Sequence, residues 1–174
     1  MKTLYESLLD DLDTLSDKAD ESLLDSVKNS VKNWINSNYH VVGLKISENT
    51  TEDGKLIVNC TRADANKYVK SLTNGMFVWG EVADYFYCAQ CRNLTSLEGA
   101  PKKVGGTFDC YLCPSLKSLE GAPNEVIGNF TCHRCSSLKT LKGAPKKVGY
   151  IFDCEDCPSL ESYDDAPKNC TIYK

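Results

Sequence analysis

A repeat of 22 residues organises the C-terminal half of this chain of 174 residues. Aligned at this offset, the sequence reads CAQCRNLTSLEGAPKKVGGTFD, CYLCPSLKSLEGAPNEVIGNFT, CHRCSSLKTLKGAPKKVGYIFD and CEDCPSLESYDDAPKNCTIYK, with no insertion between units. A fixed period of about 20 to 29 residues with apolar columns is typical of leucine-rich solenoids, whose turns bury their apolar faces only against neighbouring turns. The sequence therefore predicts a stack of rungs, one for each unit.

The alignment contains columns in which each rung carries the same residue or a close substitute. There are two cysteine columns, two mainly leucine columns, and one column each of phenylalanine, proline and valine. They comprise Cys88, Cys110, Cys132 and Cys154; Cys91, Cys113, Cys135 and Cys157; Leu94, Leu116, Leu138 and Leu160; Leu97, Leu119, Leu141 and Tyr163; Phe86, Phe108, Phe130 and Phe152; Pro101, Pro123, Pro145 and Pro167; and Val82, Val104, Val126 and Val148, followed by Cys170.

The order of the columns indicates how one rung is built. Phe108 and Cys110 alternate along one face of a short strand, and Leu119 is expected to point inward from a second extended piece. Gly121 and Pro123 are expected to turn the chain, because proline fixes φ and glycine accepts positive φ. The predicted fold class is α+β: a leucine-rich-type β-solenoid with an N-terminal helical segment and a β cap.

The pattern F-x-C-x-x-C-x-x-L-x-x-L-x-G-A-P-x-x-V-G resembles the short cysteine-containing leucine-rich repeats related to BspA-like proteins. In particular, it resembles the SLEGAPKKVGG-type repeat proteins of gut Bacteroidales and their phages. The resemblance covers residues 82–174, predicted as about four rungs, and residues 71–87 echo it as an irregular opening rung. It implies a non-catalytic recognition or structural role and a phage or bacterial origin, and it supplies no catalytic residues.

The N-terminal part divides into a helical segment over residues 1–38 and capping strands with the opening rung over residues 39–81. Thr3 and Glu6 form a capping-box pattern at the start of a leucine stripe. A second helical stripe contains Leu23, Leu24, Val27, Val31, Trp34 and Ile35. The runs YHVVGLKIS and GKLIVNC predict two strands within residues 39–60. We expect this region to cap the open solenoid end; the alternative is that residues 1–38 form a docking arm.

The paired cysteines allow four interpretations. Four pairs at one position of successive rungs favour ladders of buried thiols, since buried cysteine behaves as a small hydrophobe. This interpretation predicts neither a metal nor another cofactor. The pair spacing also fits structural zinc sites, so the first alternative is a zinc-stabilised module, and disulfides remain a further possibility. The second alternative is a thiol–disulfide redox protein, although catalytic pairs normally lie at a helix N-terminus or beside cations. The alternative zinc ligands are Cys88, Cys91, Cys110, Cys113, Cys132, Cys135, Cys154 and Cys157.

Charge and apolar patterning narrow the expected partners. The formal net charge of −4 and the lack of a continuous basic stripe argue against nucleic acid. No apolar run approaches the about 20 residues that span a bilayer, which argues against a membrane partner. The opening MKTLYESLLDDLDTLSDKAD lacks the apolar region of a signal peptide. We therefore expect a cytoplasmic protein with reduced thiols, located in a host cytoplasm or a virion if it is phage-encoded.

Between the two cysteines of each pair, the residues differ from rung to rung while the columns stay fixed. Variable residues on a rigid scaffold are where recognition is expected. The candidate binding residues are Tyr111, Leu112, His133, Arg134, Glu155 and Asp156. No Ser-His-acid arrangement, phosphate loop or acidic metal motif is present in the sequence. We predict a non-enzymatic protein-binding or structural module with a protein partner and keep open its self-association through the N-terminal helices.

Overall fold

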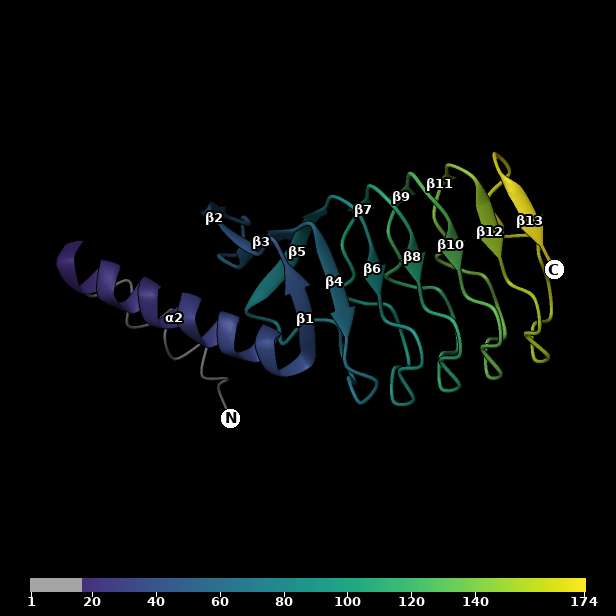
Figure 1. The fold of residues 1–174 in the computed structure, drawn as a ribbon, viewed down its shortest axis with the longest axis horizontal. Helices are drawn as coiled ribbons and strands as arrows, with labels where there is room; N and C mark the ends of the chain where they lie inside the picture. Colours follow the sequence, from purple (N-terminus) through teal and green to yellow (C-terminus); the bar gives the residue numbers. More distant parts are fainter. Residues whose placement is uncertain (1–16) are drawn as a thin grey trace.

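The computed structural model describes residues 17–174 and consists of one helix followed by strands that wind into a solenoid (Figure 1). The helix, α2 (Asp17–Asn38), contains the second apolar stripe, so the prediction of a helix there is confirmed. The expected capping box and first leucine stripe lie outside the described residues. Within the described part of the chain, no helix combines the length and apolarity needed to cross a membrane.

The strands form two sheets that run along the solenoid. The order of the seven-stranded sheet is β1 (Tyr39–Val42), β4 (Arg62–Ala65), β6 (Phe86–Tyr87), β8 (Phe108–Asp109), β10 (Phe130–Thr131), β12 (Ile151–Asp153) and β13 (Thr171–Tyr173). The order of the six-stranded sheet is β11 (Lys147–Val148), β9 (Glu125–Val126), β7 (Lys103–Val104), β5 (Phe77–Val82), β3 (Leu56–Cys60) and β2 (Lys45–Thr50). Each rung contributes one strand to each sheet along most of the stack.

The 22-residue repeat determines the register of both sheets. Phe108 pairs with Phe130, and Val104 pairs with Val126, each exactly one unit further along the chain. The rings of successive phenylalanines stack nearly parallel, with centroids 5.4, 5.2 and 5.3 Å apart from Phe86 to Phe152. All these rings are fully buried. The predicted α+β solenoid is therefore confirmed, with about five turns at the 22-residue spacing.

The solenoid begins upstream of the aligned units. Strand β3 already pairs in parallel with β5, and Cys60 lies opposite Val82. Cys60 thus occupies the start of the valine column, at the opposite end from Cys170. Residues 39–60 form three strands, where the sequence predicted two, because Gly43 adopts a positive φ of 69° between β1 and β2. Strands β1 and β2 both pair antiparallel with their neighbours, unlike the rungs.

The C-terminal part of α2 packs on the first turns of the solenoid. Val31 and Ile35 are fully buried, and the Trp34 ring lies 5.7 Å from that of Phe77. Tyr39, which follows the helix, is buried against Trp79 and Phe86. The helix therefore covers the apolar interior at the N-terminal end of the stack, while Leu24, one turn or more before this contact, is exposed.

Candidate binding surface

The two cysteine columns line the interior beside the candidate residues. All ten cysteines are free thiols, and all except the half-buried Cys170 are buried. The thiols of Cys113, Cys135 and Cys157 donate to the backbone carbonyls of Cys88, Cys110 and Cys132 in the preceding rung, at 3.1 to 3.3 Å. The first-column thiols of Cys110 and Cys154 donate forward, to the carbonyls of Thr131 and Tyr173. The thiols therefore link the rungs in both directions.

The surroundings of these thiols oppose their ionisation. Burial raises the pKa of Cys60 and of Cys154 to about 12, and it raises the pKa values of Cys88, Cys110 and Cys132 well above their ordinary range. Hydrogen bonding with the Cys91 thiol, followed by burial, raises the pKa of Cys113. Across residues 17–174, no three Cys, His, Asp or Glu side chains are grouped so that they could hold a metal ion.

A tight backbone turn between the paired cysteines positions the candidate residues. Its third residue adopts a left-handed conformation in each rung, with φ values of 57°, 52°, 58° and 52° at Gln90, Leu112, Arg134 and Asp156. Non-glycine residues in this conformation are strained by about 1 to 3 kcal/mol each. The amides of Gln90, Leu112 and Arg134 donate to the carbonyls of Tyr111, His133 and Glu155, so each turn is bonded to the next.

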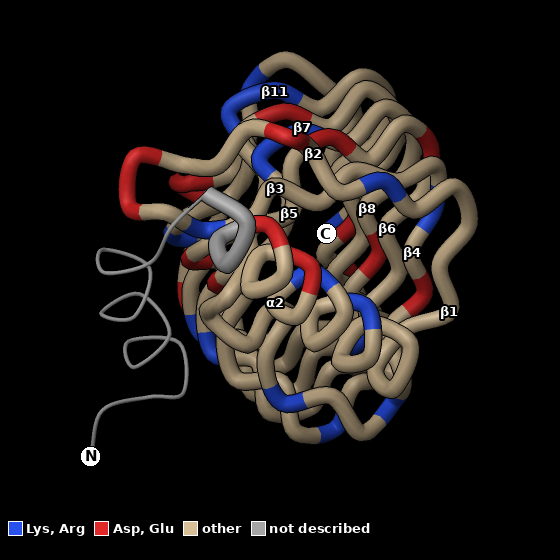
Figure 2. The backbone as a smooth tube through the Cα atoms, turned by 90° about the vertical axis from the view of Figure 1, so that its left-hand side faces the viewer, with Lys and Arg blue, Asp and Glu red and all other residues tan. Residues whose placement is uncertain are grey.

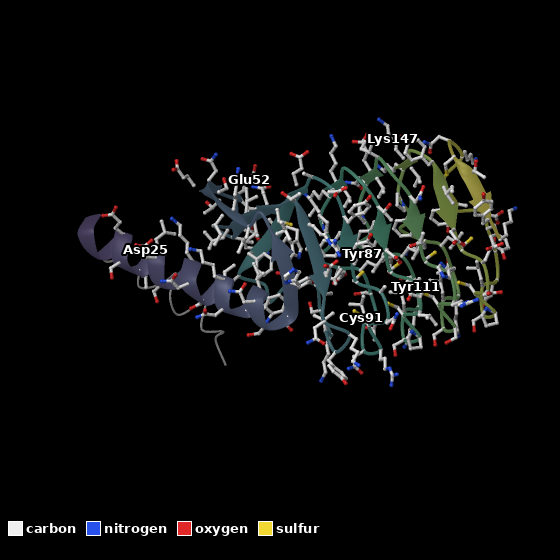
Figure 3. The ribbon with its side chains drawn as sticks, in the orientation of Figure 1. Asp25, Glu52, Tyr87, Cys91, Tyr111 and Lys147 are labelled. Atoms are coloured by element: carbon white, nitrogen blue, oxygen red, sulfur yellow. The ribbon has the colours of Figure 1, made fainter. Side chains whose placement is uncertain are left out.

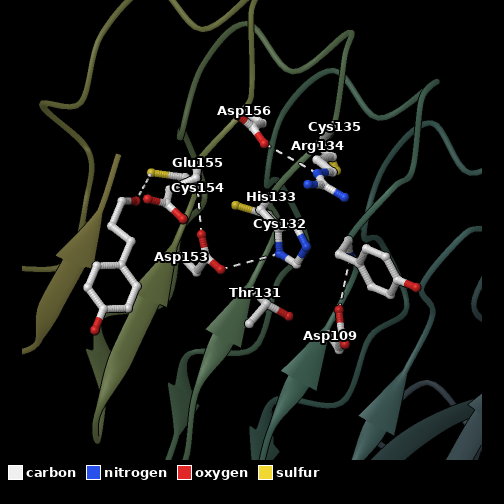
Figure 4. A network of polar contacts seen from close by, with 12 residues as sticks. Asp109, Thr131, Cys132, His133, Arg134, Cys135, Asp153, Cys154, Glu155 and Asp156 are labelled. Carbon is white, nitrogen blue, oxygen red and sulfur yellow. Dashed lines mark hydrogen bonds and ion pairs between the residues drawn. The ribbon is translucent and has the colours of Figure 1, made fainter.

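This geometry brings the six predicted residues together as two adjacent columns. Tyr111, His133 and Glu155 form the first column, and Leu112, Arg134 and Asp156 form the second. We call these six residues the turn surface. The Tyr111 and His133 rings stack with centroids 4.9 Å apart, and Arg134 Nε lies 3.3 Å from Asp156 Oδ2. Figure 4 shows the contact of Arg134 with Asp156 across two successive rungs.

His133 lies beside a carboxylate of the next rung. Its Nδ1 lies 3.3 Å from Asp153 Oδ2, close enough for an ion pair when the imidazole is protonated. That approach lacks hydrogen-bond geometry, so Nδ1 is buried without a hydrogen-bond partner among the described residues, as is the nearby Thr131 Oγ1. Because buried polar atoms are normally paired, this part of the surface retains hydrogen-bonding capacity that its own side chains do not use.

Two concave regions lie along the repeated rungs, and two others lie beside the end of α2. The larger, about 940 Å³, lies between the β2–β3 turn and the glycine–alanine corners, and it includes none of the turn surface. The smaller, about 350 Å³, includes Leu112 and Arg134. Lys67 and Arg92 also line this smaller groove. The sequence prediction missed both, because it considered only the two positions between the paired cysteines.

Comparison with protein-family models, with curated proteins and with solved structures finds no match to this chain.

Proposed function

We propose that this chain is a non-enzymatic protein-binding module that recognises a protein partner through the turn surface. The observation that carries the proposal is the presentation of six varied side chains on a backbone turn that is repeated with the same φ in successive rungs. Because hydrogen bonds join the backbone of each turn to the next, a partner meets side chains that are presented on an ordered backbone. Preorganisation of this kind lowers the entropic cost of binding.

The surroundings of the cysteines support a structural role for the pairs over a redox role. A thiol oxidoreductase needs an accessible thiolate with a lowered pKa, whereas burial raises the pKa values of the first-column thiols Cys88, Cys110 and Cys132. We also propose a cytoplasmic setting, since buried free thiols are compatible with a reducing compartment.

The experiment is a selection of peptides from a displayed random library on the full chain. Selected peptides are then measured by fluorescence anisotropy against the wild type and the triple variant Tyr111→Ala, Leu112→Ala, Arg134→Ala. We expect the triple variant to weaken binding by at least about tenfold, because aromatic and arginine side chains carry a large share of binding energy.

A matched control removes three side chains from the six-stranded sheet: Lys103→Ala, Glu125→Ala and Lys147→Ala. These residues pair in register along the same stack, and Figure 3 shows Lys147 at a different edge of the molecule from Tyr111. The control is expected to bind like the wild type. If every selected peptide bound the triple variant as well as the wild type, the turn surface would not be the recognition site.

A further inference from the structure

The smaller groove runs along the stack, across successive rungs. One wall is the third residue of each turn, namely Gln90, Leu112 and Arg134. The other wall is the residue that follows the second cysteine, namely Arg92, Pro114 and Ser136. Lys67, from the rung before Gln90, closes one end, and its carbonyl accepts a hydrogen bond from the Arg92 amide. The lining of the groove therefore follows the 22-residue repeat of the solenoid.

The charge of the groove contrasts with that of the whole chain. Lys67 and Arg92 lie toward one end and Arg134 lies at the other, and none of the described residues that line it is acidic. The chain as a whole has a formal net charge of −4. Figure 2 shows lysine and arginine along the lower edge of the molecule. A concave site that gathers three cations on an acidic protein favours an anionic ligand.

The middle of the groove is apolar. Leu112 is 39 % exposed, and Pro114 beside it is also exposed. Arg134 contacts Asp156, but both side chains are more than half exposed. Because an exposed ion pair contributes little free energy, Arg134 remains available to a ligand. The order along the groove is therefore cationic, apolar and cationic.

From this order we infer that the groove binds an extended acidic peptide in which an apolar residue is flanked by two carboxylate side chains. Lys67 and Arg134 are three rungs apart, and each rung step is close to the 5.2 to 5.4 Å between stacked phenylalanine rings, so their backbones are separated by about 16 Å. Residues i and i+4 of an extended chain lie about 13 Å apart and on the same face. The remaining difference of about 3 Å is within the reach of the long lysine, arginine and glutamate side chains. A Glu-x-Leu-x-Glu segment therefore places its carboxylates at the two ends and its leucine over Leu112 and Pro114.

This inference rests on the proposed function, because Leu112 and Arg134 belong to the turn surface, and it names the chemistry of the partner. The probe is a fluorescein-labelled peptide, Gly-Ser-Glu-Ser-Leu-Ser-Glu-Ser-Gly, titrated with the full chain. Its matched control peptide carries glutamine in place of both glutamates. We expect the acidic peptide to bind at least about tenfold more tightly, since charge-assisted hydrogen bonds are lost in the control.

Variants of the chain locate the binding. Arg92→Gln and Arg134→Gln should each weaken binding of the acidic peptide by about fivefold to tenfold, whereas Lys139→Gln, an exposed lysine outside the groove, should leave it unchanged. Asp156→Asn should strengthen binding by about twofold, because it removes a carboxylate beside Arg134. Circular dichroism melting verifies that each variant is folded, and having two arginine variants keeps the test open if one fails to fold.

Several results would overturn the inference. These are equal binding of the two peptides, no binding of either peptide, or a loss of affinity in Lys139→Gln as large as that in the arginine variants. Tighter binding of a single-stranded oligonucleotide with the same arginine dependence would identify a different class of ligand. If the library selection yielded non-acidic peptides that depend on the turn surface, the inference about carboxylates would fail while the proposed function stood.

Discussion

At the residue scale, cysteine serves this fold both as an apolar side chain and as a donor to the backbone. The thiol of Cys113 is buried and donates to the carbonyl of Cys88 in the preceding rung. Valine meets only the first of these requirements, and the opening rung carries Val69 at the equivalent buried position. Conversely, Cys60 lies opposite Val82 in the valine column. Valine thus replaces cysteine in the second cysteine column, and cysteine replaces valine in the valine column. We infer that side-chain volume determines which residues fit these positions, and that the thiols add hydrogen bonds between rungs.

The buried thiols predict a loss of stability at alkaline pH. Free cysteine ionises near pH 8.5, whereas burial raises the folded-state pKa of Cys60 and of Cys154 to about 12. Between these values the unfolded chain releases protons that the folded chain retains, so rising pH favours unfolding. The free energy of unfolding, measured by urea denaturation under reducing conditions, should fall from pH 8 to pH 9.5. The slope approaches about 1.4 kcal/mol per pH unit for each thiol fully ionised only in the unfolded state.

A variant with one thiol fewer provides the control for this pH dependence. Cys113→Ala should show a shallower decline than the wild type over the same range, because one raised thiol pKa has been removed. A free energy of unfolding that stayed constant up to pH 9.5 would contradict the assignment of these cysteines as buried thiols.

At the element scale, three successive rungs contain a glycine corner that lies close to the preceding rung. Gly99, Gly121 and Gly143 have φ values of 85° to 87°. A Cβ atom on Gly121 would lie 2.5 Å from the Cα atom of Glu98 in the preceding rung. Gly75 has the same φ of 87° as Gly121, but a Cβ there would meet nothing within 4 Å. The two glycines separate the cost of the backbone conformation from the cost of the close approach.

This comparison predicts unequal effects of the same substitution. Gly75→Ala should destabilise the protein by about 1 to 2 kcal/mol, the cost of a left-handed conformation for a residue with a Cβ. Gly121→Ala should destabilise the protein by at least about 1 kcal/mol more than Gly75→Ala, because the backbones of two rungs must also move apart. Urea denaturation of both variants measures the difference. Equal losses would mean that the rungs are not packed as closely as described.

Much of the element scale could be predicted because a fixed period determines which residues are neighbours. Phe108 pairs with Phe130 for this reason. The left-handed residues of the cysteine turns were not predictable in the same way, because Leu112 and Arg134 belong to types that seldom adopt positive φ. The groove cation Lys67 was missed because it precedes the aligned units, and its position depends on how the opening rung pairs.

At the scale of the whole molecule, the two ends of the solenoid differ. The C-terminal part of α2 covers the N-terminal end, with Val31 and Ile35 fully buried. At the other end, β13 is the last strand of the seven-stranded sheet. Leu160, Cys170 and Ile172 are only partly buried there, although they continue the interior columns. The stack is therefore closed by helix packing at one end and more exposed at the other.

The capping role of α2 predicts a large effect from one buried side chain. Ile35→Ala should destabilise the protein by about 2 to 5 kcal/mol, as expected for a fully buried residue. Leu24→Ala, in the same helix but 38 % exposed, should change stability by less than about 1 kcal/mol. Urea denaturation compares the two. Similar small effects would show that the helix does not contribute to the core and would favour the docking-arm interpretation.

The central claim is that the paired cysteines are buried, reduced and part of the apolar interior. Native mass spectrometry tests it most directly, on full-length protein purified without chelator and treated with an alkylating reagent before and after denaturation. The account predicts the mass of the bare chain, early modification of the half-buried Cys170, and modification of the other nine thiols only after unfolding. Additional mass in units of zinc that is lost together with the folded state, or rapid modification of paired cysteines in the native protein, would contradict it.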